Sequence, residues 1–161
     1  MSNLHRVCFY GSSETIWNIQ GFAEFRKEGE GKVATRSSDV FVFCGYSAKL
    51  SCEVNKYNNV MYFGLYLRLC QGPRDSLLKW PFTIPYTLIL VHPTDEKKNV
   101  EFSVTDFDTA LQSKFNNFHR PTTAENMGYG KRKLCKVEDL EVRDFVFKDS
   151  LCAGVKVRPE S

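Results

Sequence analysis

Residues 72–82 read GPRDSLLKWPF, and this stretch decides the fold that we expect of the chain. Trp80, Pro81 and Phe82 follow two leucines and come directly before the apolar run 83–91. Large rings at the entrance to a strand are typical of a corner that closes a hydrophobic core, where each buried ring contributes roughly 1.5–3 kcal/mol. We therefore predict that Trp80 and Phe82 plug the core between two strands.

Apolar and polar residues alternate with a period of two on both sides of this corner. Residues 47–54, 60–69, 100–104 and 151–157 each place apolar side chains on one face, whereas residues 83–91 are apolar on both faces. This pattern is typical of strands with one buried face, and of one strand that is buried on both. Roughly eight short strands at this spacing predict an all-β protein, either an antiparallel sandwich or a barrel.

The connecting segments carry turn signals, and two of them carry helical ones. Residues 29–31 (GEG) are expected to form a turn, and residues 106–114 and 137–143 are each expected to form a short helical turn. Residues 1–13 are expected to form a loose lead-in, so the folded domain is predicted to span residues 14–158. A length of 161 residues suits one such domain.

The charge and the cysteine content narrow the class of protein. A net charge of +3 is mild, so it argues only weakly for a nucleic-acid binder. None of the cysteines forms a C-x-x-C motif, and no apolar run approaches the roughly 18 residues of a membrane span. Buried free thiols in a reducing compartment fit these observations, and we predict a cytoplasmic protein. The cysteines are Cys8, Cys44, Cys52, Cys70, Cys135 and Cys152.

No constellation of residues in the sequence predicts catalysis. The histidines are scattered, and the chain lacks the nucleophile-elbow, zinc-protease and Walker motifs. Asp106 and Asp108 stand two apart, which is common in turns and weak evidence for an acid–base pair. We therefore expect no enzyme activity, no metal and no cofactor.

Four features, taken in order along the chain, resemble one known family. They are residues 16–22 (IWNIQGF), Gly45-Tyr46, residues 72–82, and the run from residues 118–130 into residues 145–157. They are similar to the TRAF-C, or MATH, domain of the tumour-necrosis-factor-receptor-associated factors, over about residues 14–158. Trp-Pro-Phe after a Leu-Leu pair is typical of the TRAF-type members.

The resemblance implies a non-catalytic antiparallel β-sandwich of about eight strands. It also implies a cytosolic signalling adaptor that binds short extended peptides from receptor tails or adaptor proteins, adding the peptide as a strand to a sheet edge. Family members usually form homotrimers through a coiled coil that this chain lacks, so the chain is expected to be a fragment or a reduced member. The alternative is a MATH domain that recognises substrates for a ubiquitin-ligase adaptor or a protease.

The resemblance also implies a peptide site that is assembled from several segments. Its edge strand, which pairs with the peptide, falls at residues 128–131, and its pocket aromatics fall at Tyr66 and Phe107. A serine cluster of some members becomes residues 115–117 here, and a Gly-Asp-Gly turn becomes residues 56–58. The implied peptide-binding residues are Ser51, Glu53, Tyr57, Tyr66, Phe107, Phe115, Asn116, Asn117, Gly128, Tyr129, Gly130 and Lys131.

The charge of this site departs from the family pattern. A basic and an aromatic residue that usually contact an acidic peptide residue are replaced by Ser51 and Glu53. Like charges close together repel by about 1 kcal/mol or more, so Glu53 is expected to disfavour acidic ligands unless Lys131 points across the groove and offsets it. We therefore expect that the edge site is kept and that its preferred peptide differs from the family's usual motif.

Residues 126–133 (NMGYGKRK) leave one further alternative open. Tyr129, Lys131 and Lys133 alternate with Gly130 and Arg132, which predicts a strand whose glycines allow another backbone to approach closely. The same basic residues, with Lys136 and Tyr129, would suit a nucleic-acid binder, although such runs are usually solvated surface charge. We expect neither a nucleic-acid partner nor insertion into a membrane.

Overall fold

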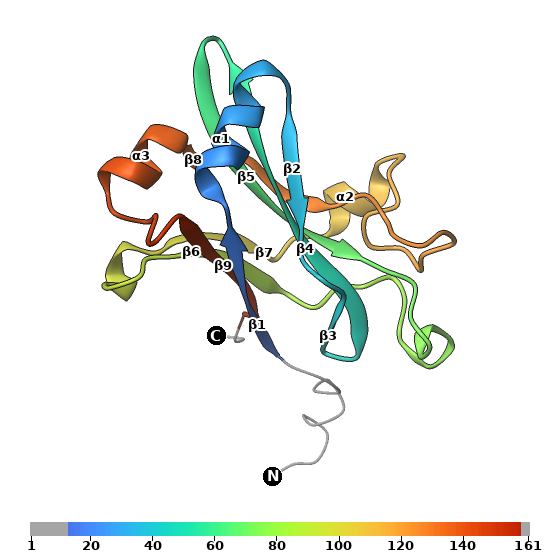
Figure 1. The fold of residues 1–161 in the computed structure, drawn as a ribbon. Helices are drawn as coiled ribbons and strands as arrows, with labels where there is room; N and C mark the ends of the chain where they lie inside the picture. Colours follow the sequence, from blue (N-terminus) through green and yellow to red (C-terminus); the bar gives the residue numbers. More distant parts are fainter. Residues whose placement is uncertain (1–12, 159–161) are drawn as a thin grey trace.

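Nine strands dominate residues 13–158, the part of the chain that the computed structural model describes (Figure 1). The strands are β1 (Glu14–Gln20), β2 (Ala34–Ser37), β3 (Phe41–Phe43), β4 (Tyr46–Tyr57), β5 (Val60–Leu69), β6 (Tyr86–Val91), β7 (Val100–Val104), β8 (Tyr129–Lys136) and β9 (Ser150–Val157). The helices are α1 (Phe22–Gly31), α2 (Asp108–Gln112) and α3 (Val137–Val142), with 3-10 turns η2 (Asp75–Leu77) and η3 (Glu96–Lys98). The lead-in predicted at residues 1–13 lies, apart from Ser13, outside the described residues.

The strands form two sheets that pack face to face. One sheet has four strands in the order β1-β9-β6-β7. The other has five strands, with the path β2-β4-β5-β8 and with β3 paired to β4. Every strand pairing between named strands is antiparallel. The predicted antiparallel β-sandwich is therefore confirmed, with nine strands in the described residues in place of about eight.

Phe82 lies in the core between the two sheets. Its ring is fully buried and has its centroid 4.9–6.2 Å from those of Tyr46, Tyr86, Phe107 and Phe118. Trp80 is half-buried and packs edge-on against Tyr46, with ring centroids 5.0 Å apart. The predicted plug is therefore confirmed, with Phe82 inside the core and Trp80 at its rim.

The segments with alternating residues are strands, as predicted. They lie within β4, β5, β7 and β9, and the run 83–91 forms β6 from Tyr86 onward with both faces buried. The two predicted helical turns form α2 and α3. No helix among residues 13–158 is long and apolar enough to cross a membrane.

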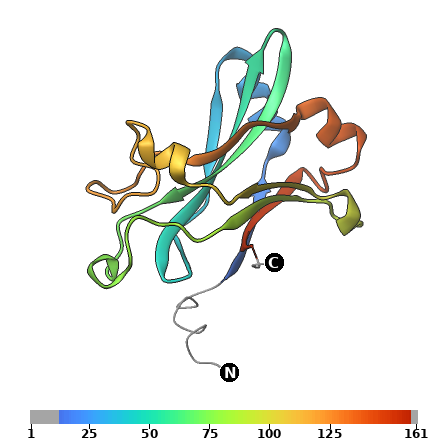
Figure 2. The same cartoon turned by 180° about the vertical axis from the view of Figure 1, so that it is seen from behind.

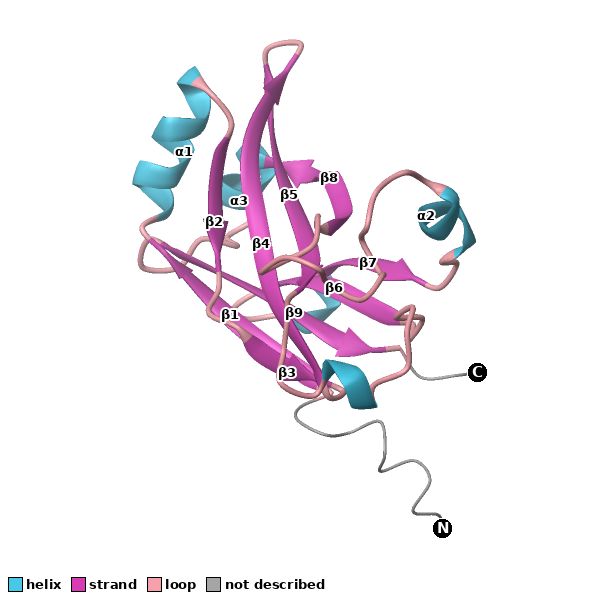
Figure 3. Cartoon of the chain, turned by 90° about the vertical axis from the view of Figure 1, so that its right-hand side faces the viewer, coloured by secondary structure: helices cyan, strands magenta, loops and turns pink. Residues whose placement is uncertain are grey.

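The turn predicted at residues 29–31 is wrong, because these residues end helix α1. Phe22 and Phe25 anchor the helix through buried side chains. Gly29 is buried so closely against Val54 of β4 that a Cβ at this position would collide with the valine side chain. Gly29 is therefore needed for close packing of a helix on a sheet, and Figure 3 shows α1 beside β2 and β4.

Strand β8 forms an edge of the five-stranded sheet, and within residues 13–158 it pairs only with β5. The register places Tyr129 opposite Leu67, but it shifts at a bulge opposite the β5 segment between Phe63 and Leu65. The alternation predicted for residues 129–133 is therefore wrong within the bulge, which comprises residues 132–134. Tyr129 faces the core beside Phe118, whereas the Lys133 ammonium lies over the Tyr57 ring, 3.8 Å from its centroid.

Strands β7 and β8, each at one edge of its sheet, lie on the same side of the sandwich. Figure 2 shows β8 running close to β7 when the molecule is seen from behind. The Lys131 ammonium bridges the two, because it lies 5.6 Å from the centroid of the Phe102 ring on β7. Lys131 thus points to the other sheet.

Candidate functional site

A cavity of about 450 Å³ lies where three strands of the five-stranded sheet meet the segment before β8. We call it the outer groove. Its lining residues come from β2 (Thr35, Ser37), β4 (Ser51, Cys52, Glu53), β5 (Tyr66, Arg68) and the segment before β8 (Glu125, Met127, Gly128).

The strand register explains why these residues share one face. In the ladder Ser51 lies opposite Ser37 on one side and Tyr66 on the other, while Glu53 lies opposite Thr35 and Gly64. Directly opposed residues point to the same face of a sheet, so these side chains gather on the face opposite the core. Because successive side chains of β4 point to opposite faces, one face of the strand is buried in the core and the other face forms the floor of the groove.

A charge network ties the rim of the groove to its floor. The Glu125 carboxylate pairs with Lys49 Nζ at 2.9 Å and with Arg68 Nε at 3.2 Å. The hydrogen bond from Lys49 to Glu125 raises the pKa of the lysine. Arg68 also donates to the backbone carbonyl of Asn126 at 2.8 Å. Residues 125–126 are therefore fixed against β4 and β5.

Two asparagines brace the rest of the rim from outside. The amide nitrogen of the Asn117 side chain donates to the carbonyls of Met127 at 3.2 Å and Gly128 at 3.1 Å. The Asn116 side chain accepts a hydrogen bond from the Met127 N–H at 3.0 Å. These asparagines position residues 127–128, and neither lines the cavity itself.

Glu53 supplies the charge at the floor of the groove. Its side chain is 17% exposed, and one carboxylate oxygen accepts from the Asn55 side chain at 3.0 Å and lies 3.7 Å from Arg132 Nε. Tyr66 donates its hydroxyl hydrogen to Glu53, and burial followed by this hydrogen bond raises the pKa of Tyr66 well above its usual value. The floor therefore presents a carboxylate held by three neighbouring side chains.

The sequence and the fold identify the family to which this arrangement belongs. Residues 14–157 match the family model of the MATH domain. The chain belongs to the MATH-domain family.

Two relatives place this MATH domain among the TRAF-type members. Human TNF receptor-associated factor 2 is 27% identical over 139 residues, which cover 83% of this chain and 26% of that protein. The structure of TRAF5 from Notothenia coriiceps superposes with a TM-score of 0.75 at 26% identity, over 92% of this chain and 74% of that one. The chain thus spans about a quarter of the length of the human relative. It is a protein-interaction domain of the TRAF-C type.

The MATH fold brings some of the predicted site residues together and separates others. Ser51, Glu53, Tyr66 and Gly128 line the outer groove. Tyr129, Gly130 and Lys131 follow on the adjoining edge strand, although Lys131 does not offset Glu53, because Arg132 occupies that position. The close neighbour of Gly130 is the Leu65 carbonyl of β5, which a Cβ would strike.

Three predicted residues lie away from the groove of this MATH domain. Phe107 is 6% exposed and packs in the core against Phe118, so it offers no surface to a ligand. Tyr57 lies at the end of the β4–β5 hairpin under Lys133. Phe115 is exposed but does not line the cavity. Conversely, Thr35, Ser37, Arg68 and Glu125 line the groove and were not predicted, since their role depends on which strands become neighbours.

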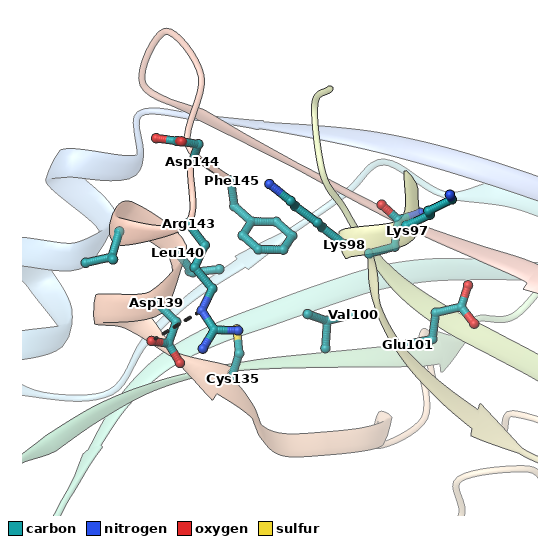
Figure 4. A pocket seen from close by; sticks show the side chains of 12 residues that line it. Lys97, Lys98, Val100, Glu101, Cys135, Asp139, Leu140, Arg143, Asp144 and Phe145 are labelled. Atoms are coloured by element: carbon teal, nitrogen blue, oxygen red, sulfur yellow. Dashed lines mark ion pairs between the residues drawn. The ribbon is translucent and has the colours of Figure 1, made fainter. Parts of the chain in front are cut away.

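A larger cavity of about 770 Å³ opens between the start of β7 and helix α3 (Figure 4). Its walls combine the apolar side chains of Val100, Leu140 and Phe145 with charged residues, among them the ion pair between Arg143 and Asp139 at 4.0 Å. Cys135 also lines it, and burial raises the pKa of this thiol to about 12. None of the predicted site residues lines it.

Proposed function

We propose that this MATH domain binds short extended peptides in the outer groove and along the adjoining edge of β8. The observation that carries this proposal is the position of a cavity directly beside an edge strand that, in the described residues, pairs on one side only. A peptide strand can pair with such an edge through its main chain, while the neighbouring cavity receives one of its side chains. The relevant length of β8 is short, because the bulge interrupts it after Lys131.

The second part of the proposal concerns the cellular role of this peptide binding. The similarity to human TNF receptor-associated factor 2 supports an adaptor that recruits receptor tails or adaptor proteins in the cytosol, and that acts without catalysis. It favours this setting over a ubiquitin-ligase adaptor or a protease. A homotrimer assembled through a coiled coil outside this chain would suit the role, because linked weak sites gain avidity.

Peptide selection followed by calorimetry tests the proposal. Random peptides displayed on phage are selected on the full chain, and the selected sequences are synthesised and titrated. Ser37→Trp introduces a large ring at the exposed groove margin, so we expect it to weaken binding by about tenfold or more. Leu77→Trp is the matched control, because Leu77 is 83% exposed on η2 and outside the groove.

Two outcomes would contradict the proposal. Peptides that bind equally well to wild-type protein and to Ser37→Trp would place the site elsewhere. Failure to select any peptide, together with tight RNA or DNA binding that falls steeply with salt, would favour the nucleic-acid alternative through the basic residues of β8.

A further inference from the structure

Glu53 stands at the centre of the outer groove, between strands on both sides. Its cross-strand neighbours are Thr35 on β2 and Gly64 on β5, and the Tyr66 side chain reaches over Gly64 to donate its hydroxyl hydrogen to the carboxylate. A partly buried carboxylate retains acceptor capacity, since its two oxygens offer about four lone-pair sites. A ligand side chain that enters the groove therefore meets Glu53 at its floor.

The other charged residues that line the groove are already compensated. Glu125 is bound by both Lys49 and Arg68, and Arg68 in turn also donates to a backbone carbonyl. Glu53 accepts hydrogen bonds from the uncharged Asn55 and Tyr66 side chains, and its cationic neighbour Arg132 lies 3.7 Å away with a side chain that is 66% exposed. A long exposed side chain of this kind loses little when it turns into water. Glu53 is thus the groove charge that is most available to a ligand.

A second polar group in the groove, the Ser51 hydroxyl, lacks a hydrogen-bond partner within residues 13–158. Ser51 is 6% exposed and lines the cavity, and its buried hydroxyl has no hydrogen-bond partner. A buried hydroxyl that is left unpaired costs free energy, which a ligand N–H recovers by donating to its oxygen. Ser51 is two residues from Glu53 on the same strand, so one ligand group with several N–H donors suits both.

We infer that the outer groove selects a peptide that places a lysine or arginine side chain against Glu53 and Ser51. This inference rests on the proposed peptide-binding function. The ligand cation replaces Arg132 as the partner of Glu53, donates a further hydrogen bond to the Ser51 hydroxyl, and leaves Arg132 in solvent. An acidic side chain at the same position meets the Glu53 carboxylate and is disfavoured.

The test compares peptides that are selected on three forms of the full chain. On wild-type protein we expect Lys or Arg to be enriched at one fixed position of the selected phage-displayed peptides. On Glu53→Gln that enrichment disappears, and on Glu53→Lys it changes to Asp or Glu. A synthetic peptide from the wild-type selection loses about tenfold or more in affinity when its basic residue is changed to Glu, and this order reverses on Glu53→Lys.

Two further variants distinguish a failure of the inference from a failure of the proposed function. Arg132→Gln removes the competing cation, so it is expected to strengthen binding of the basic peptide to otherwise wild-type protein. Peptides that require the groove, as shown by loss of binding to Ser37→Trp, but that carry no basic preference would overturn the inference and leave the proposed function intact. If no selected peptide depends on Ser37, the proposed function and the inference both fail. Thermal unfolding of each variant verifies that it is folded.

Discussion

Trp80 donates its indole N–H to the backbone carbonyl of Asp75 at 2.8 Å. The Asp75 carboxylate also accepts a hydrogen bond from the Gly72 N–H at 3.0 Å. The two bonds together join the start and the end of the corner of residues 72–82 through Asp75. Tyr46 seals the other side by donating its hydroxyl to the Lys79 carbonyl at 2.5 Å. The corner is thus held by polar contacts as well as by the burial of Phe82.

Replacing Trp80 by Phe should destabilise the protein by about 1–2 kcal/mol, because the Asp75 carbonyl loses its donor and Tyr46 loses part of its ring contact. Urea unfolding of the full chain measures the change. Leu77→Phe, on the exposed η2 turn, should change stability by less than about 0.5 kcal/mol. Equal effects of the two substitutions would argue against a structural role for the indole.

Replacing Asn117 by Ala should loosen the rim of the outer groove. Two backbone carbonyls, of Met127 and Gly128, lose their donor, and a hydrogen bond of this kind contributes about 0.5–1.5 kcal/mol. Hydrogen exchange followed by mass spectrometry should show faster exchange in residues 126–129. Exchange there should stay unchanged in the exposed control Thr122→Ala, and unchanged exchange in Asn117→Ala would show that the rim is held by other contacts.

Replacing Gly64 by Ala should destabilise the pairing of β5 with β8. A Cβ at Gly64 would lie 2.8 Å from the Arg132 carbonyl and 3.1 Å from the Tyr66 hydroxyl, so backbone must shift at a cost of about 1–3 kcal/mol. Gly31→Ala at the end of α1 is the matched control, because no atom lies within 4 Å of its added Cβ. We expect it to be neutral or slightly stabilising. Similar unfolding midpoints for both variants would contradict the tight approach at the bulge.

Stability should fall at alkaline pH because of buried thiols. Burial raises the pKa of Cys135 from 9.0 to about 12, and it raises the pKa of Cys52 further. Above pH 9 the unfolded chain releases these protons while the folded chain retains them, so stability is full below pH 9 and is lost as the pH rises toward 12. Each such thiol contributes about 1.4 kcal/mol per pH unit to the loss.

Urea unfolding between pH 8 and pH 11 measures this slope. Cys135→Ala removes one of the two thiols, so its stability should decline less steeply with pH than that of wild-type protein, whatever its stability at pH 8. Parallel curves for the two proteins would show that the Cys135 thiol ionises equally in the folded and unfolded chains.

Local patterns were enough to predict most strands and the plug. The alternation in β4 and β5 depends only on which face is buried, so it is visible in the sequence. Helix α1 was missed because Gly21 caps it in a left-handed conformation without a side-chain hydrogen bond, and because Gly29 looks like a turn residue. The need for glycine at position 29 is explained only by the close packing of Val54, which lies on a strand far away in the sequence.

The groove could be predicted only in part, for a similar reason. Ser51, Glu53 and Tyr66 are on strands that the sequence shows clearly. The contribution of Thr35 and Ser37 comes from β2, which has only four residues and a weak pattern. The resemblance implied a pocket role for Phe107, but this side chain is buried because Phe118 and Phe82 pack around it. Such residues are placed by long-range packing, which no local period reveals.

The bulge in β8 also affects how the protein behaves at high concentration. A long, regular and apolar sheet edge recruits identical chains, one strand after another, and leads to fibrils. Here the ladder is broken after Lys131, and exposed lysine and arginine side chains occupy the bulged stretch. Copies of the chain would bring like charges together and could not continue a common ladder. The β8 edge can therefore pair with a short peptide, but it does not support the repeated addition of identical chains as further strands.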